Sequence, residues 1–451
     1  MSASETLKRQ LGLPTATALV VGETIAVGIF LTPAGMAKSL GSPALVFAAW
    51  LVMGAMALCG ALCYGELATR FPQAGGGYVY LREAYGAPVA FLYGWMALLV
   101  MDPGLTAALA VGLAGYVGYS FGLSPAGVKL VAVSSIIALA AANVRGVRLG
   151  AWFVRWLTLI KLCALAFILV WGFAFRLGDW SNFAPLVARR AGSPPLAGAL
   201  AGGMVAAFFS FGGWWDVSKV AGEVRRPART LPRALALGVI LVTLVYAVTS
   251  AAFIYLVPMG RVASGETFAA QAGEALFGRA GGQLFSAVVI VAVLGSLAGV
   301  IMSAPRVYFA MARDGLFFRA AAAVHPRYGT PARAVAVQAA LASALVLLGT
   351  FNEIVSYFVF VVVIFLALTV AALFVLRRRG AESAPAYLTP GYPATPAAFL
   401  LLIALLLILL AGGNPRQSLL GVAVVAAGLP VYYLLFRRKP VAADSHGEEE
   451  S

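Results

Sequence analysis

The sequence predicts an all-α polytopic membrane protein with twelve transmembrane helices. Of its 451 residues, 62% are hydrophobic and only 11% are charged, a balance far from that of a soluble domain. Apolar runs long enough to cross a bilayer, about 20 residues each, recur along the whole chain. Two of these runs are interrupted by glycines close to an acidic residue, so we expect two of the spanning helices to be broken.

The polar start, Met1 to Pro14, lacks the apolar core of a cleaved signal peptide, so the first apolar run is expected to be a true span. A polar tail, 437–451, is expected to follow the last span. The predicted spans cover residues 15–38, 43–68, 88–119, 124–143, 150–175, 198–219, 234–256, 281–311, 332–349, 352–376, 395–412 and 418–436.

The formal charge of +15 indicates how the chain is oriented in the membrane. With an inside N-terminus, 23 of the 32 Lys and Arg residues fall in segments on the inner side of the membrane. This excess is the positive-inside signal, and it predicts that both termini are cytoplasmic. We therefore expect the lipid bilayer, and no nucleic acid, as the partner of this basic chain.

The stretch Phe208–Asp216 (FFSFGGWWD) is the first predicted break. Two adjacent glycines cost a continuous helix about 1 kcal/mol each relative to Ala, but they reach the backbone angles of an unwound turn. Backbone N–H and C=O groups that lose their helical hydrogen bonds within the bilayer must line a cavity or hold a ligand. The alternative is close packing of helices on small residues, although the flanking aromatics and Asp216 suit a pocket better.

The first span carries the second break, with Gly22 and Gly28 on either side of Glu23. An ionisable group at this depth is costly and is a functional candidate; the alternative is a buried acid paired with a base. Two more ionisable residues fall within spans, Asp102 before Pro103-Gly104 and Lys161 in span five. Desolvation favours neutral Lys161, whereas a nearby acid favours the charged form.

Other polar or reactive groups are expected to be structural. Glu66 lies near the end of its helix, where it is expected to pair with a loop arginine. Cys59, Cys63 and Cys163 all fall within spans and are expected to be reduced packing residues. No metal-ligand spacing, cofactor motif or catalytic constellation is present in the sequence.

The two breaks also imply an internal symmetry. Span one enters from inside and span six from outside, each interrupted by glycine near an acid, which indicates an inverted repeat of five plus five spans. A single transporter domain, 1–436, is then predicted, with repeats of about 15–175 and 198–376 and accessory helices at 395–436. Such folds bind substrate at mid-membrane between the two breaks.

The chain resembles the amino acid–polyamine–organocation superfamily, and within it the L-type amino acid transporter branch, from about residue 10 to 436. The resemblance lies in motifs that together are specific: Gly28-Ile29-Phe30, Gly41-Ser42-Pro43, Gly60 to Leu67 (GALCYGEL), Lys161, Phe211-Gly212-Gly213-Trp214, and Thr230 to Ala234 (TLPRA).

This resemblance implies transport of an amino acid by alternating access. Backbone N–H groups near Val27 and Gly28 would receive the substrate carboxylate, as a half-helix N-terminus does. Phe209 would be the aromatic gate. The coupling residues would be Lys161, at the sodium position of sodium-coupled relatives, with Glu23, Gly22 and Asp102. The implied substrate-binding residues are Thr24, Ile25, Ala26, Val27, Gly28, Phe209, Ser210, Phe211, Gly212 and Gly213.

Departures from the family pattern shape the expected substrate. Ala26-Val27 is bulkier than the usual residues there, which favours small or medium neutral amino acids, with sodium-independent exchange or proton coupling. The alternative is a transporter of cationic amino acids or polyamines, because three acids, at positions 23, 102 and 216, could attract a cationic substrate. A membrane-embedded enzyme is a remote alternative. The loop 120–124 lacks the cysteine that eukaryotic members use for a heavy chain, so no covalent partner and a bacterial inner-membrane location are expected.

Overall fold

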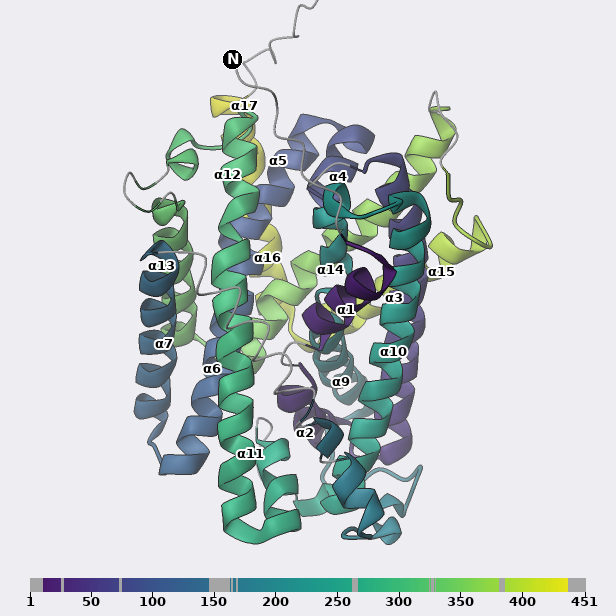
Figure 1. Cartoon of the computed structure of the whole chain (residues 1–451), viewed down its shortest axis with the longest axis vertical. Helices are drawn as coiled ribbons and strands as arrows, with labels where there is room; N and C mark the ends of the chain where they lie inside the picture. Colours follow the sequence, from purple (N-terminus) through teal and green to yellow (C-terminus); the bar gives the residue numbers. More distant parts are fainter. Residues whose placement is uncertain are drawn as a thin grey trace, which may run out of the picture.

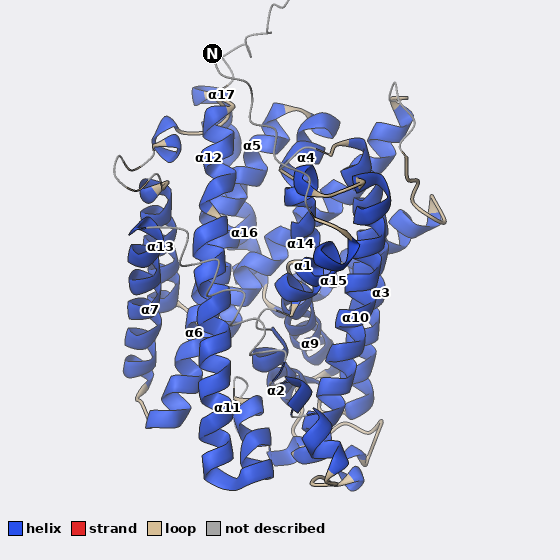
Figure 2. Cartoon of the chain, in the orientation of Figure 1, coloured by secondary structure: helices blue, strands red, loops and turns tan. Residues whose placement is uncertain are grey.

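The computed structural model is a bundle of helices (Figure 1). In the part of the chain that the structure describes, helices are joined by loops (Figure 2). Leu11 and Val224 form an isolated parallel bridge. The described residues are 11–25, 28–72, 75–145, 163, 165–167, 169–261, 267–323, 325, 328, 330–380 and 386–436.

The helices follow one another closely along the chain. In the first half they are α1 (Leu13–Thr24), α2 (Gly28–Leu40), α3 (Pro43–Arg70), α4 (Gly77–Tyr85), α5 (Ala87–Met96), the π-helix η1 (Ala97–Met101), α6 (Asp102–Phe121), α7 (Pro125–Arg145) and the 3-10 helix η2 (Trp180–Phe183). In the second half they are α9 (Leu196–Phe211), η3 (Trp214–Glu223), α10 (Pro227–Leu256), η4 (Met259–Arg261), α11 (Phe268–Ser303), α12 (Pro305–Arg313), η5 (Arg319–Ala322), α13 (Ala332–Leu348), α14 (Phe351–Arg378), α15 (Ala394–Gly413), α16 (Pro415–Ala426) and α17 (Gly428–Leu435).

Among the described residues, nine helices are long and apolar enough to cross a membrane, and a tenth span results if the bent pair α1–α2 counts as one. Two shorter apolar helices, Leu165–Ala174 and Ala332–Leu348, fall within the predicted spans 150–175 and 332–349. The prediction of an all-helical polytopic membrane protein is therefore confirmed.

Both predicted breaks are visible as interruptions of helices. The axes of α1 and α2 differ by 45°. The helix α9 ends at Phe211, where Gly212 leaves the helical conformation, and Gly213 has φ +105°, in the left-handed region. Only glycine enters that region without strain. The chain then continues as the tighter 3-10 helix η3. The break at the two glycines follows the sequence prediction.

Glu66 is fully buried and joins three parts of the chain. One carboxylate oxygen accepts from Arg70 at 2.9 Å and from Nε of Arg377 on α14 at 2.9 Å. The other accepts the backbone N–H of Thr389 at 2.8 Å. A buried carboxylate is stable only when paired in this way, so Glu66 is a structural anchor between α3, α14 and the segment before α15. This confirms the expected pairing with an arginine.

Candidate functional site

The two helix breaks lie against each other in the middle of the bundle. α1 packs on α10, and α2 packs on α9. A Cβ added to Gly28 would lie 2.3 Å from Cα of Ser210, and one added to Gly213 would lie 2.9 Å from the carbonyl oxygen of Glu23. Real Cβ atoms do not approach other atoms so closely, so both positions require glycine. The glycines therefore bring the unwound backbone of one break into contact with the other.

Tyr246 on α10 connects the breaks. Its side chain is fully buried, and its hydroxyl lies 2.8 Å from the carbonyl oxygen of Thr24 and 2.6 Å from that of Ser210. These carbonyls stand at the ends of α1 and α9, where helices leave acceptors unsatisfied. The single hydroxyl proton is thus shared between backbone oxygens of both breaks and fixes their relative position.

Hydroxyl side chains form a second link between the broken spans. Oγ1 of Thr32 lies 2.6 Å from Oγ of Ser210. Each hydroxyl also lies within hydrogen-bond distance of a carbonyl of its own helix, Thr32 at 2.9 Å from that of Gly28 and Ser210 at 3.0 Å from that of Ala206. Because each hydroxyl has one proton, one of the two donates to its own helix while the other donates across the pair. The backbone around the breaks is consequently held by side-chain hydroxyls in an otherwise apolar interior.

Aromatic side chains enclose this contact. The ring of Trp50 lies 4.9 Å from that of Tyr246 and 6.1 Å from that of Phe211. The indole N–H of Trp50 donates to Oγ of Ser250 at 2.8 Å. Burying an indole or a phenol is favourable when its polar end finds a partner, so the aromatic cluster stabilises the position of Tyr246.

Phe209, the predicted gate, is buried beside the break. Its ring meets those of Phe351 and Phe358 edge to face, with centroids 5.8 Å and 6.1 Å away. Both partners belong to α14. Phe209 is therefore packed between the broken span and a neighbouring helix, and its gating role stays a prediction.

The structure describes only some of the predicted coupling residues. Lys161, Ala26 and Val27 lie outside the described residues. Glu23, in the last turn of α1, is exposed, whereas Asp102 is 5% exposed and begins α6. The coupling of Glu23 to Lys161 stays a prediction.

Asp102 belongs to a buried polar network that the sequence did not reveal. Its backbone carbonyl accepts from Oγ1 of Thr106 at 2.7 Å, and that hydroxyl accepts from Nε2 of Gln338 at 3.0 Å. Tyr308 on α12 donates to Oε1 of Gln338 at 3.4 Å and acts electrostatically on the Asp102 carboxyl, as Lys219 also does. The network connects α6 to α12 and α13.

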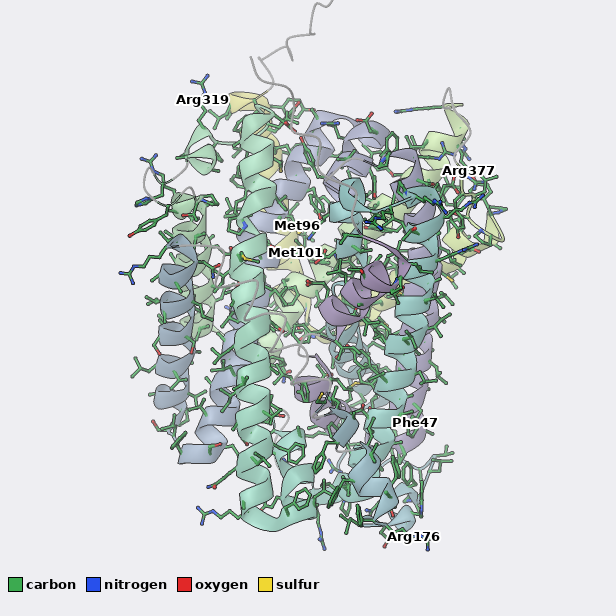
Figure 3. All side chains as sticks on the ribbon, viewed as in Figure 1. Phe47, Met96, Met101, Arg176, Arg319 and Arg377 are labelled. Atoms are coloured by element: carbon green, nitrogen blue, oxygen red, sulfur yellow. The ribbon has the colours of Figure 1, made fainter. Side chains whose placement is uncertain are left out.

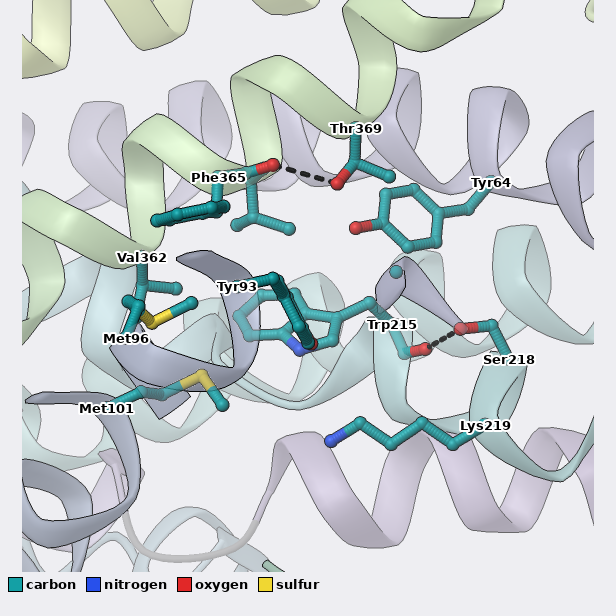
Figure 4. Close-up of a pocket in the computed structure, with 12 residues that line it drawn as sticks. Tyr64, Tyr93, Met96, Met101, Trp215, Ser218, Lys219, Val362, Phe365 and Thr369 are labelled. Atoms are coloured by element: carbon teal, nitrogen blue, oxygen red, sulfur yellow. Dashed lines mark hydrogen bonds between the residues drawn. The ribbon is translucent and has the colours of Figure 1, made fainter. Parts of the chain in front are cut away.

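Lys219 and Asp216 form an ion pair of 2.7 Å on η3. The positive-inside count places Lys219 in a cytoplasmic segment, but the structure places it in a pocket between helices, lined also by Tyr64, Tyr93 and Trp215 (Figure 4). In Figure 3 the pocket residues Met96 and Met101 lie between the end that carries Arg319 and the end that carries Arg176.

Two functional candidates, Tyr246 and Lys219, were missed by sequence reasoning. Tyr246 stands in an apolar run with no glycine or acid beside it, so only a tyrosine hydroxyl at mid-span marks it. The spacing of Asp216 and Lys219 is visible in the sequence, but the 3-10 helix that aligns them is not. Among the described residues, no three His, Cys, Asp or Glu side chains cluster in a way that could hold a metal ion.

Comparisons with known proteins show the family of the chain. The family model described as "Amino acid permease" matches residues 11–436. The chain belongs to the amino acid permease family. It is a transporter of the amino acid–polyamine–organocation superfamily rather than an enzyme, and a multi-pass membrane protein.

Individual relatives cover nearly the whole chain. The serine/threonine exchanger SteT of Bacillus subtilis (strain 168) is 32% identical over 437 residues, which are 96% of this chain and 98% of the relative. The Asc-type amino acid transporter 1 of Mus musculus is 29% identical over 453 residues, 96% of this chain and 83% of the relative. The human large neutral amino acids transporter small subunit 2 is 29% identical over 439 residues, 95% and 80%.

Proposed function

We propose that this amino acid transporter is a sodium-independent exchanger of small or medium neutral amino acids that works by alternating access. The observation that carries the proposal is the contact between the two glycine breaks, bridged by Tyr246. Backbone N–H and C=O groups at facing helix breaks suit the carboxylate and ammonium of a zwitterion. The relatives named as exchanger and as neutral amino acid transporters support the substrate class.

The proposal includes the finer architecture. Twelve spans would form an inverted repeat of five plus five with two accessory helices, and the substrate would bind between α1–α2 and α9–η3. Both termini would face the cytoplasm of a cell whose plasma membrane holds the protein. The distribution of Lys and Arg residues and the presence of two glycine breaks support this orientation and symmetry.

Sodium independence rests on the sequence position of Lys161, whose ammonium would stand where a relative binds a cation. A fixed positive charge repels a second cation at short range. Uptake should therefore be equal in sodium and potassium media, and Lys161→Ala should slow transport in a protein that still folds. A steep dependence of wild-type uptake on sodium would overturn this part.

Counterflow of labelled amino acids in proteoliposomes tests the function. We expect unlabelled serine, alanine or threonine inside the vesicle to accelerate uptake of labelled serine. Acceleration by an imposed proton gradient in the absence of internal substrate would instead indicate proton symport. Failure of every amino acid in a broad panel to exchange would reject the proposal.

A cationic amino acid or polyamine substrate is the second candidate, because acids stand near both breaks. In the structure, however, the Asp216 carboxylate is neutralised by Lys219 at 2.7 Å, which weakens its attraction for a cation. Competition decides between the two. Strong inhibition by arginine or putrescine, with none by alanine or serine, would favour the second candidate.

A further inference from the structure

The Lys219–Asp216 ion pair stands at the edge of the pocket. Lys219 is one of the lining residues, and Asp216, which is not, holds the Lys219 ammonium at 2.7 Å. The two residues are three apart on η3, and a 3-10 helix has three residues per turn, so their side chains project from the same side. Their side chains are 31% and 30% exposed, although the Asp216 oxygen that faces Lys219 is itself buried.

The pocket wall suits the body of an amino acid. Tyr64 from α3, Tyr93 from α5 and Trp215 from η3 line it, together with apolar residues of α14 (Figure 4). Aromatic faces bind both apolar side chains and ammonium groups. In this structure the pocket is no larger than a water molecule, so these side chains must part before a ligand enters.

The pocket is next to the central break. Trp215 is the second residue after Gly212-Gly213, and its ring stacks on that of Phe208 with centroids 6.4 Å apart. At its far end, η3 leads to Val224, which pairs with Leu11 near the N-terminus. The pocket thus lies between the break and the face of the bundle where Leu11 lies, here termed the N-terminal face.

A second carboxylate, that of Asp102 at the start of α6, interacts electrostatically with both members of the ion pair. The side chains of Tyr93 and Tyr308 are the other titratable groups that interact with Asp102. The ammonium of Lys219 is therefore attracted by carboxylates on two different helices. Separation from Asp216 does not leave it without a counter-charge.

We propose that Lys219 and Asp216 form a second binding site for a zwitterionic amino acid, occupied as the substrate passes between the central breaks and the N-terminal face. The substrate carboxylate pairs with Lys219 and its ammonium with Asp216, while its side chain lies against the aromatic wall. Every charge keeps an opposite partner during the exchange, so the large cost of an unpaired buried charge is avoided. This inference rests on the proposed function.

The test is the Michaelis constant for labelled serine, measured separately from each face. An N-terminal affinity tag sorts vesicles by which face is outside. The double variant Asp216→Asn with Lys219→Met removes both charges of the ion pair, so neither charge is left without its partner. Loss of charge-assisted hydrogen bonds should raise KM at the N-terminal face roughly tenfold to a hundredfold, with KM at the opposite face within about twofold of wild type.

Lys219→Arg is the matched control, because it keeps the positive charge, and it should restore most of the affinity. If the double variant does not purify as a monodisperse protein, Lys219→Gln takes its place with the same expected direction. Equal KM changes on both faces, or no change, would overturn the second site. A rise on one face matched by a fall on the other would also overturn it, since that pattern marks a shift between conformations.

Wild-type exchange from both faces is the reference for these measurements. Its absence would reject the proposed function itself. Intact wild-type exchange with unchanged KM in the variants would reject only the second site.

Discussion

Tyr246→Phe tests whether the link between the two breaks supports transport. The substitution removes one hydroxyl and leaves the ring in its cluster with Trp50 and Phe211. Two buried carbonyl oxygens, those of Thr24 and Ser210, lose their donor. A lost hydrogen bond costs about 1 kcal/mol, and a buried group left unsatisfied costs about 1–3 kcal/mol.

The expected effect on transport follows from that range. If the cost falls on the conformation that binds substrate, 1–3 kcal/mol corresponds to roughly a five- to 150-fold rise in KM. A cost shared equally by all conformations would lower thermal stability and leave KM unchanged. Initial rates of counterflow over a range of serine concentrations, with a melting curve for each variant, separate these two outcomes.

Tyr255→Phe is the control on the same helix, because its ring packs on Phe173 away from the breaks, with centroids 5.3 Å apart. It should leave KM near that of wild type. If purified Tyr246→Phe protein transports serine with wild-type KM and turnover, the bridging hydroxyl has no part in forming the substrate site.

Three more substitutions probe other parts of the structure. Gly28→Ala should abolish counterflow, because the new Cβ would lie 2.3 Å from the backbone of α9, whereas Gly412→Ala, with nothing within 4 Å, should be silent. Phe209→Ala should lower turnover more than it raises KM for serine if the ring closes the site and excludes water, and wild-type turnover in a stable variant would remove the gate assignment. Glu66→Gln should cost about 3 kcal/mol or more of stability by leaving buried arginine contacts unpaired, without altering KM, while the exposed Glu83→Gln should leave the melting temperature unchanged.

The sequence predicted those features that depend on local pattern. Apolar runs predicted the spans, and Gly212-Gly213 predicted the break between α9 and η3, because the helix propensity and backbone freedom of glycine are local properties. Glu66 was placed correctly because an acid near a helix end needs a cation. Its second arginine, on α14, lies far along the chain, and no spacing rule could reveal it.

The residues that escaped prediction depend on long-range contacts. Tyr246 reaches Thr24, on a helix more than two hundred residues earlier in the chain. The network around Asp102 draws its partners from α12 and α13. These polar groups form hydrogen bonds with partners on other helices. Hydropathy averages over neighbours in the sequence, so it cannot predict such long-range pairs.

The π-helix η1 determines which side of the third predicted span, 88–119, the residues on either side of it face. Five residues of an α-helix turn through about 500°, which would leave Met96 and Met101 about 140° apart around the axis. Bonds from residue i to i+5 wind the chain more slowly, and both methionines line the same pocket. Removing one residue between them would leave four steps of a regular α-helix, about 400°, so the two methionines would still lie within about 40° of each other around the axis. The wide turn therefore takes up one extra residue without changing how the two halves of the span face this pocket.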